Sequence, residues 1–518
     1  MRNSTQIKNH PKITIIKKTA LFLLLSVIFA CVYTQSPLFT SNQNQYFLHG
    51  MAQAKLGSLS QDWLANTLDP TPVFSFFVKL TFQLIGFKEI FYLYYALLMG
   101  LYCYSLLGIL DSLFQIYASR IKKLLSFVLI IVISSAALRF ELEQSLGANW
   151  SFLFDGGLAG QRALGLVFQP SIFGIFLIFS IHLFLKEKPF WAIAMAVLAA
   201  SIHPTYLLSA VSLGFGYLFA TWIFEKEYKK VFFMGLEGLL LAAPILIYVF
   251  SSFVSSQTQA QANEIMVNFH IPYHAIVKDW FDITSIIKIT IIALGIWLIR
   301  QQKRIFIPLL FSAIIASVLT IFQVITQNQM LALIFPWRLS IYLVPICTMI
   351  LGTQIVIKPL TDWVSKTMQR QNLIQIISGI LLLTCFFTGI LRTKLDFDQQ
   401  NTQPEQPMLT WVKNNSTDQD IYLVDPQIKD FRLATLRPIY SDLLATPYAG
   451  DDVLTWYSRV MSALKLVDNR NCSDIVYLQH DGGITHIVLD KKRSTLNCPQ
   501  LITTFEDSNY VVYKIIKK

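Results

Sequence analysis

The chain of 518 residues is too apolar for a soluble globular protein: 54% of its residues are hydrophobic, 14% are charged, and its mean hydropathy is +0.50. Its net charge of +11 would fit a nucleic-acid-binding protein, but the basic residues are concentrated in alternate loops between apolar segments. Cytoplasmic loops of membrane proteins carry such an excess of lysine and arginine. The charge therefore indicates membrane topology and argues against a nucleic-acid partner.

Apolar segments of about 18 to 22 residues, bounded by charged residues, predict transmembrane helices. We expect eleven such spans, with the N-terminus inside and the C-terminus outside. They cover residues 14–34, 89–112, 123–140, 163–185, 190–205, 206–224, 231–252, 284–300, 305–326, 338–358 and 371–391. Residues 190–224 could form one long helix. His203-Pro204 and the lysines at both ends predict two short spans instead, because proline ends or kinks a helix.

A long polar loop, residues 35–88, follows the first span and is expected outside the membrane. Residues 46–54 and 73–85 each have an apolar face at helical spacing, which predicts two amphipathic helices at the membrane interface. Two acids, Asp62 and Asp69, lie in the elbow between them. Either acid is a candidate general base. Asp62 could instead cap a helix, and Asp69 precedes a proline in what could be an ordinary turn.

The later outer loops contain two arginines and three histidines that could bind a substrate. Arg162 ends the flexible run GGLAGQR, and Arg338 ends the segment FPWR. A guanidinium group suits bidentate binding of phosphate, although arginines at the ends of spans also extend to lipid headgroups. His203 lies in a turn, and His270 and His274 lie in HIPYH. The proline between the last two argues against a helical metal-binding pair.

The final segment, residues 397–518, has the polar composition of a soluble domain. Its apolar runs alternate with a helical pattern, which predicts a small α/β domain. The expected strands are residues 421–425, 485–491 and 511–517, and the expected helix is residues 451–466. Cys472 and Cys498 are the two cysteines of this segment. An oxidising outer compartment would allow a disulfide between them, and the sequence leaves this pairing open.

The phrases FRLATLRPIY (431–440) and VLTWYSRV (453–460) resemble those of an uncharacterised bacterial multi-pass membrane family. The order of a long first outer loop, many short-looped spans and an outer soluble domain resembles the GT-C superfamily of membrane glycosyltransferases. The resemblance implies a GT-C-like transmembrane domain over residues 1–396 and an extracytoplasmic domain over residues 397–518. It also implies a bacterial inner (plasma) membrane protein that uses a polyprenyl-phosphate sugar donor.

In GT-C enzymes a carboxylate of the first outer loop serves as the base, so the resemblance assigns this role to Asp62 or Asp69. Arg338 and Arg162 would hold the donor phosphate. The three histidines, His203, His270 and His274, would line the pocket.

One segment departs from the GT-C pattern. The first loop of these enzymes commonly opens with an acidic pair, whereas residues 42–45 of this chain read NQNQ and are uncharged. A non-catalytic lipid or polysaccharide transporter, or an assembly scaffold, is therefore the alternative function. We expect no metal or cofactor, and the sequence does not indicate a divalent cation. The expected partners are a lipid-linked sugar donor and membrane lipids, and the sequence identifies no protein partner.

Overall fold

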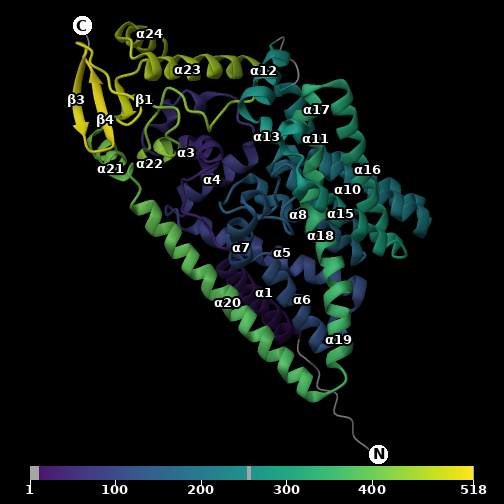
Figure 1. The fold of residues 1–518 in the computed structure, drawn as a ribbon. Coiled ribbons are helices and arrows are strands. Elements are labelled where there is room, and N and C mark those ends of the chain that lie inside the picture. The colour runs from purple at the N-terminus through teal and green to yellow at the C-terminus, as the bar shows by residue number, and fades with distance from the viewer. Residues whose placement is uncertain (1–10, 254–257, 517–518) are drawn as a thin grey trace, which may run out of the picture.

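A computed structural model describes residues 11–253 and 258–516, which form a helical bundle with a small sheet domain at one end (Figure 1). Each predicted span overlaps one helix of the bundle, except that residues 123–140 cover parts of two. The helices of the bundle are α1 (Pro11–Tyr33), α5 (Ile90–Phe114), α6 (Arg120–Ile133), α7 (Ala136–Leu146), α8 (Ile175–Leu185), α9 (Pro189–Ile202), α10 (Leu207–Ala220), α11 (Tyr228–Phe253), α15 (Ile283–Leu298), α16 (Lys303–Thr326), α18 (Ser340–Gly352) and α20 (Met368–Asn401).

Six helices of the described ranges are long and apolar enough to cross a membrane, and α6 with α7, bent by 48°, would make a seventh. The remaining predicted spans correspond to shorter apolar helices. The chain is thus a mostly helical membrane protein with several spans, while the number eleven and the orientation stay predictions. The predicted break at His203-Pro204 is confirmed, because α9 ends at Ile202 and α10 begins at Leu207.

The predicted span 163–185 is wrong in its first part, because helix begins only at Pro170, in a 3-10 turn that leads into α8. Residues 163–169 are non-helical although most of them are apolar and buried. The hydroxyl of Tyr95 donates a hydrogen bond to the Gly165 carbonyl and accepts one from the Gly165 amide. A tertiary partner thus satisfies backbone groups that a helix would have paired internally.

The loops between the spans contain shorter helices. These are α2 (Gln43–Tyr46), α3 (Leu48–Gln53), α4 (Pro72–Leu84), α12 (Gln259–Ile265), α13 (Pro272–Ala275), α14 (Val277–Trp280), α17 (Gln329–Leu333) and α19 (Lys358–Val364). The two helical segments predicted in the first loop correspond to α2 with α3 and to α4. The prediction that the first is an amphipathic helix at the membrane interface is wrong, because five of the six residues of α3 are buried inside the protein. Gly50 lets α3 and α4 approach closely, since a Cβ atom there would lie 2.6 Å from the Ser75 carbonyl oxygen.

The C-terminal domain contains a four-stranded mixed sheet in the order β1-β2-β4-β3, in which only β1 and β2 are parallel. Its elements are α21 (Gln406–Asn415), β1 (Tyr422–Val424), α22 (Phe431–Thr435), α23 (Gly450–Asn469), α24 (Cys472–Gly482), β2 (His486–Asp490), β3 (Leu501–Glu506) and β4 (Tyr510–Ile515). The three predicted strands coincide with β1, β2 and β4, except that residue 517 lies outside the described ranges. The edge strand β3 was not predicted.

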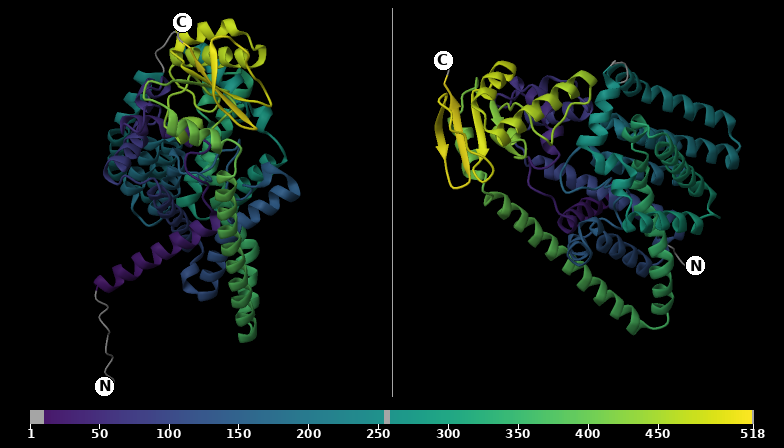
Figure 2. Two further views of the ribbon diagram at one scale, coloured as in Figure 1. Left: turned by 90° about the vertical axis from the view of Figure 1, so that its left-hand side faces the viewer. Right: turned by 45° about the horizontal axis from the view of Figure 1, so that its top comes forward.

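Helix α20 runs along the side of the bundle from the end far from the C-terminal domain up to α21 (Figures 1 and 2). It continues through residues 396 and 397, where the sequence predicts the domain boundary, and ends at Asn401. Cys472, at the start of α24, forms a disulfide with Cys498, with their Cα atoms 5.6 Å apart.

We expect Cys472→Ser to lower the free energy of unfolding of the C-terminal domain by about 3 kcal/mol, because the bridge joins residues separated by 26 positions. The change can be measured as a lower thermal midpoint and faster proteolysis of this domain in detergent. Cys31→Ser, which removes a free cysteine of α1, is the control. Alkylation of both Cys472 and Cys498 without reductant would contradict the disulfide.

Candidate functional site

A cavity of about 1080 Å³ lies where the first loop, the loops that precede α8 and α18, and the C-terminal domain meet. Figure 1 shows α3, α12 and α17 at the end of the bundle beside the C-terminal domain, and the right-hand view of Figure 2 brings this end forward. The C-terminal domain itself contributes Leu443, Leu444 and Tyr448 to the wall. The cavity is therefore closed by both parts of the chain.

All five residues predicted to bind substrate line this cavity. They are Arg162, His203, His270, His274 and Arg338. They come from separate loops, and the structure brings them together because each loop lies at the same end of the bundle. The distribution of charge, which assigned these loops to one side of the membrane, was therefore enough to predict that these residues lie together.

Arg338 is held against His203. Its Nη1 donates a hydrogen bond to His203 Nε2 at 3.2 Å, and its guanidinium lies over the Tyr206 ring, 5.4 Å from the centroid. Because a guanidinium group can only donate, His203 Nε2 must accept, and the ring proton is on Nδ1. His203 is therefore neutral and serves to orient the arginine. The Nε atom of Arg338 is buried and has no hydrogen-bond partner in the described structure, so one N–H of the guanidinium is unpaired.

His270 and His274 are neutral at physiological pH. Burial lowers the pKa of His270 to about 4, with a further contribution from neighbouring His274. Burial and the charges of Arg338 and Arg162 together lower the pKa of His274 to about 4. The His270 ring packs edge-on against Trp456 of α23, with centroids 5.2 Å apart. The two arginines thus provide the positive charge of the cavity.

Amide side chains make up much of the remaining wall. Nine of them line it: Asn42, Gln45, Gln161, Gln169, Gln259, Asn263, Gln327, Asn328 and Gln329. No carboxylate of the described part of the chain lines it. The sequence analysis did not select these residues, because uncharged amides are common in loops. The sequence does contain one signal of this wall, which is the clustering of asparagine and glutamine at residues 42–45 and 327–329.

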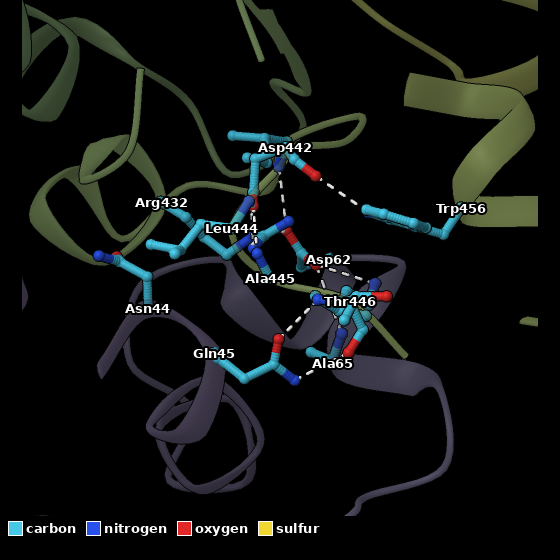
Figure 3. Close-up of polar contacts among 12 residues, drawn as sticks. Asn44, Gln45, Asp62, Ala65, Arg432, Asp442, Leu444, Ala445, Thr446 and Trp456 are labelled. Atoms are coloured by element: carbon cyan, nitrogen blue, oxygen red, sulfur yellow. Dashed lines mark hydrogen bonds and ion pairs between the residues drawn. The ribbon is translucent and has the colours of Figure 1, made fainter. Parts of the chain in front are cut away.

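Asp62, a predicted base, does not line the cavity. It is fully buried, and its Oδ2 accepts hydrogen bonds from Arg432 Nε at 2.9 Å and from the Ile439 amide at 3.0 Å. Its Oδ1 accepts from the Leu64 amide at 2.9 Å. Arg432 also donates to Asp442 Oδ2 at 2.6 Å (Figure 3). Asp62 is thus occupied in joining the first loop to the C-terminal domain, and we do not retain it as the base.

Asp69, the other predicted base, lies beside the cavity without lining it. Its Oδ1 accepts a hydrogen bond from the Thr71 amide at 2.9 Å, as in an Asx turn. Its Oδ2 is buried and has no hydrogen-bond partner in the described structure. Pro70 and Thr71, which follow it, do line the cavity. Asp69 is therefore a neighbour of the wall residues, but it is not itself among the residues that line the cavity.

The uncharged segment of residues 42–45 also contacts the C-terminal domain. Gln45 Nε2 donates to the Thr446 carbonyl at 2.8 Å, and the Thr446 amide donates to Gln45 Oε1 at 2.5 Å (Figure 3). Asn44 Nδ2 donates to Asp430 Oδ1 at 2.9 Å. Carboxylates at these positions could not make the donating halves of these contacts. The hydrogen bonds that these amides donate therefore give a structural reason for amides at these positions in place of an acidic pair.

The described residues contain no group of three or more histidine, cysteine, aspartate or glutamate side chains that could hold a metal ion. The polar chemistry of the cavity is that of two arginines, three histidines and neutral side chains.

A family described as a domain of unknown function (DUF6798) matches residues 403–463, which contain both phrases noted above. No curated protein matches the chain. The chain is similar in fold, over most of its length, to solved structures of low sequence identity.

One of these structures is the apo oligosaccharyltransferase of Archaeoglobus fulgidus, with a TM-score of 0.47, 11% identity, and coverage of 94% of this chain and 70% of that chain. Another is apo ArnT from Cupriavidus metallidurans, with a TM-score of 0.45, 13% identity and 97% coverage of both chains. The archaeal enzyme AglB with an inhibitory peptide and a dolichol-phosphate has a TM-score of 0.42, 12% identity, and coverage of 92% and 69%. Similarities at this level assign no activity to this chain.

We expect Arg432→Met to lower the free energy of unfolding by about 3–5 kcal/mol, because Asp62 and Asp442 would remain as unpaired buried carboxylates. Thermal unfolding in detergent and proteolysis of the C-terminal domain would measure the loss. Lys465→Met breaks an ion pair with Asp474 in which the lysine side chain is 59% exposed. It should change stability by less than about 1 kcal/mol. Equal effects of the two variants would contradict the proposal that the Asp62–Arg432–Asp442 ion pairs join the first loop to the C-terminal domain.

The histidines predict a pH dependence of stability. The pKa values of His270 and His274 are about 4 in the folded protein. They are near 6.5 in an unfolded chain, so the unfolded state binds more protons between these values. The thermal midpoint should therefore fall as the pH is lowered from about 6.5 to about 4. His270→Asn should reduce this slope, whereas the exposed His480→Asn should follow the wild-type curve. An unchanged slope in His270→Asn would contradict the assignment.

Proposed function

We propose that this chain is a membrane glycosyltransferase that takes its sugar from a polyprenyl-phosphate donor bound in the cavity. The observation that carries the proposal is the composition of the cavity wall, which contains two arginines and nine amides and, over the described ranges, no carboxylate. A phosphate is attracted to the arginines. Amides both donate and accept hydrogen bonds, as sugar hydroxyls require.

Arg338 and Arg162 are proposed to hold the donor phosphate. The guanidinium of Arg162 is oriented by the Phe152 ring, 4.0 Å from its centroid, and that of Arg338 by His203. Because both groups are fixed before a ligand binds, they would stabilise negative charge as it develops on the leaving phosphate.

The donor's lipid tail has an apolar path beside the cavity. A second groove of about 370 Å³ lies between α10 and α16, and Leu208 lines both it and the cavity. The other residues of this groove are Val211, Ser212, Phe215, Phe219, Phe311 and Ile315. An isoprenoid chain that leaves the phosphate at Arg338 would enter this groove and remain in an apolar environment.

The C-terminal domain is proposed to face the acceptor. Its residues Leu443, Leu444 and Tyr448 form one wall of the cavity. If the predicted orientation holds, this wall and the donor phosphate both lie at the outer face of the bacterial inner membrane. An acceptor would then approach the cavity from the extracytoplasmic side.

A non-catalytic lipid-phosphate carrier or scaffold is the second candidate function. The absence of a carboxylate from the described cavity wall favours it, as does the use of Asp62 to bind Arg432. The two functions share the phosphate site and differ in whether a sugar is transferred from the lipid. A measurement of lipid binding thus tests both, and a measurement of sugar transfer separates them.

We expect Arg338→Gln to weaken binding of undecaprenyl phosphate by about 10- to 100-fold, because it removes charge-assisted hydrogen bonds to the phosphate. Native mass spectrometry or a thermal-shift titration in detergent would measure the affinity. Arg300→Gln is the matched control, because Arg300 is exposed, stacks on Trp297 and does not line the cavity. Equal affinities of Arg338→Gln and the wild type would overturn the phosphate site, and so would a wild-type protein that binds no lipid phosphate.

A further inference from the structure

A glycosyl transfer needs a proton acceptor, and both acids selected from the sequence lie outside the cavity wall. Asp62 is paired with Arg432, and Asp69 lies in a turn beside the cavity. The remaining bases in the described wall are the three histidines. Their ring nitrogens can be assigned from the hydrogen bonds that each ring makes.

His203 cannot serve, because its Nε2 lone pair accepts a hydrogen bond from Arg338. The His270 ring packs against Trp456, and no hydrogen bond fixes either of its nitrogens among the described residues. His274 differs from both: its Nδ1 lies 2.6 Å from the Ala159 carbonyl oxygen. A carbonyl oxygen can only accept, so Nδ1 bears the proton and Nε2 bears the lone pair.

The carbonyl that orients His274 is itself held in place. The Leu158 amide donates to Ser340 Oγ at 2.7 Å, and Lys288 Nζ donates to the Gly157 carbonyl at 2.9 Å. Gly160, with φ of +66°, brings its backbone against the imidazole, since a Cβ atom there would lie 3.0 Å from Cε1 of His274. The ring therefore has little freedom to rotate. Its Nε2 has no hydrogen-bond partner in the described structure, and the ring lines the cavity.

We propose that His274 Nε2 is the general base of the transfer reaction, in place of a carboxylate; this inference rests on the proposed function. The acceptor hydroxyl oxygen forms a bond to the anomeric carbon of the sugar, and the bond from that carbon to the phosphate oxygen breaks. The bonding electron pair leaves on the phosphate between Arg338 and Arg162. The hydroxyl proton moves to Nε2 and is later released to water, so the products are the glycosylated acceptor and polyprenyl phosphate.

The surroundings of His274 keep the base in its neutral form before the reaction. Arg338 and Arg162 both carry positive charge near the ring, His270 is a neutral neighbour, and the Tyr273 ring packs against it with centroids 4.4 Å apart. Burial and the two arginines hold the pKa near 4, so the imidazole is unprotonated at neutral pH. The same arginines stabilise the phosphate, and the reaction therefore needs no ionised carboxylate in the cavity.

The test is His274→Asn. The asparagine side-chain NH₂ group can keep the hydrogen bond that Nδ1 donates to Ala159, while Nε2 is lost. We expect this variant to bind undecaprenyl phosphate within about threefold of the wild type. We expect sugar transfer to fall by at least about 100-fold, the lower range of general-base contributions. His480→Asn, an exposed substitution in α24, should keep both properties.

Transfer can be measured without knowing the acceptor, by mass spectrometry of envelope glycans and lipid-linked sugars in a strain that lacks the gene and carries each variant. Wild-type output from His274→Asn would overturn the base, and so would a loss of undecaprenyl phosphate binding in that variant. If deletion of the gene changes no glycan while the protein binds the lipid phosphate, the transferase itself fails and the carrier function stands. The two failures are therefore distinguishable.

Discussion

The buried guanidinium of Arg432 is the constraint on which the rest of the site depends. It is 3% exposed and bridges Asp62 of the first loop and Asp442 of the C-terminal domain. An unpaired charge at such a depth costs several kcal/mol, so the three groups must come together for the chain to fold. These ion pairs place the Leu443–Tyr448 segment against the cavity. The region matched by the family of unknown function, residues 403–463, contains Arg432, Asp442 and this cavity wall, whereas Asp62 lies outside it.

This use of Asp62 changes the electrostatics of the cavity. With its carboxylate committed to Arg432, and with amides at residues 42–45, the described wall has two arginines and no opposing acid. Such a wall attracts an anion and keeps neighbouring histidines neutral, because protonation would add a third positive charge. One chemical consequence follows: the neutral imidazoles become the available proton acceptors. The burial of the Asp62 carboxylate therefore affects both the stability of the fold and the chemistry of the cavity.

The tautomers show how the protein assigns different roles to similar residues. His203 and His274 are both neutral, but Arg338 donates to Nε2 of the first, whereas Ala159 accepts from Nδ1 of the second. The His203 ring thereby orients Arg338, and the His274 ring presents the lone pair of its Nε2 to the cavity. The residue type alone does not show this difference, because the tautomer of each ring depends on which hydrogen-bonding group lies next to it.

The sequence by itself determined where helices form, because hydropathy and proline act over short distances. It also determined which loops gather at one end of the bundle, and this grouped Arg162, Arg338 and the three histidines. Only the tertiary structure decided the role of Asp62, whose partner Arg432 is 370 residues away. It also decided that residues 163–169 are non-helical and that Gly165, Leu166, Val167 and Gln169 among them line the cavity. Local patterns report burial, whereas ion pairs and hydrogen bonds between distant segments depend on neighbours that only the folded chain supplies.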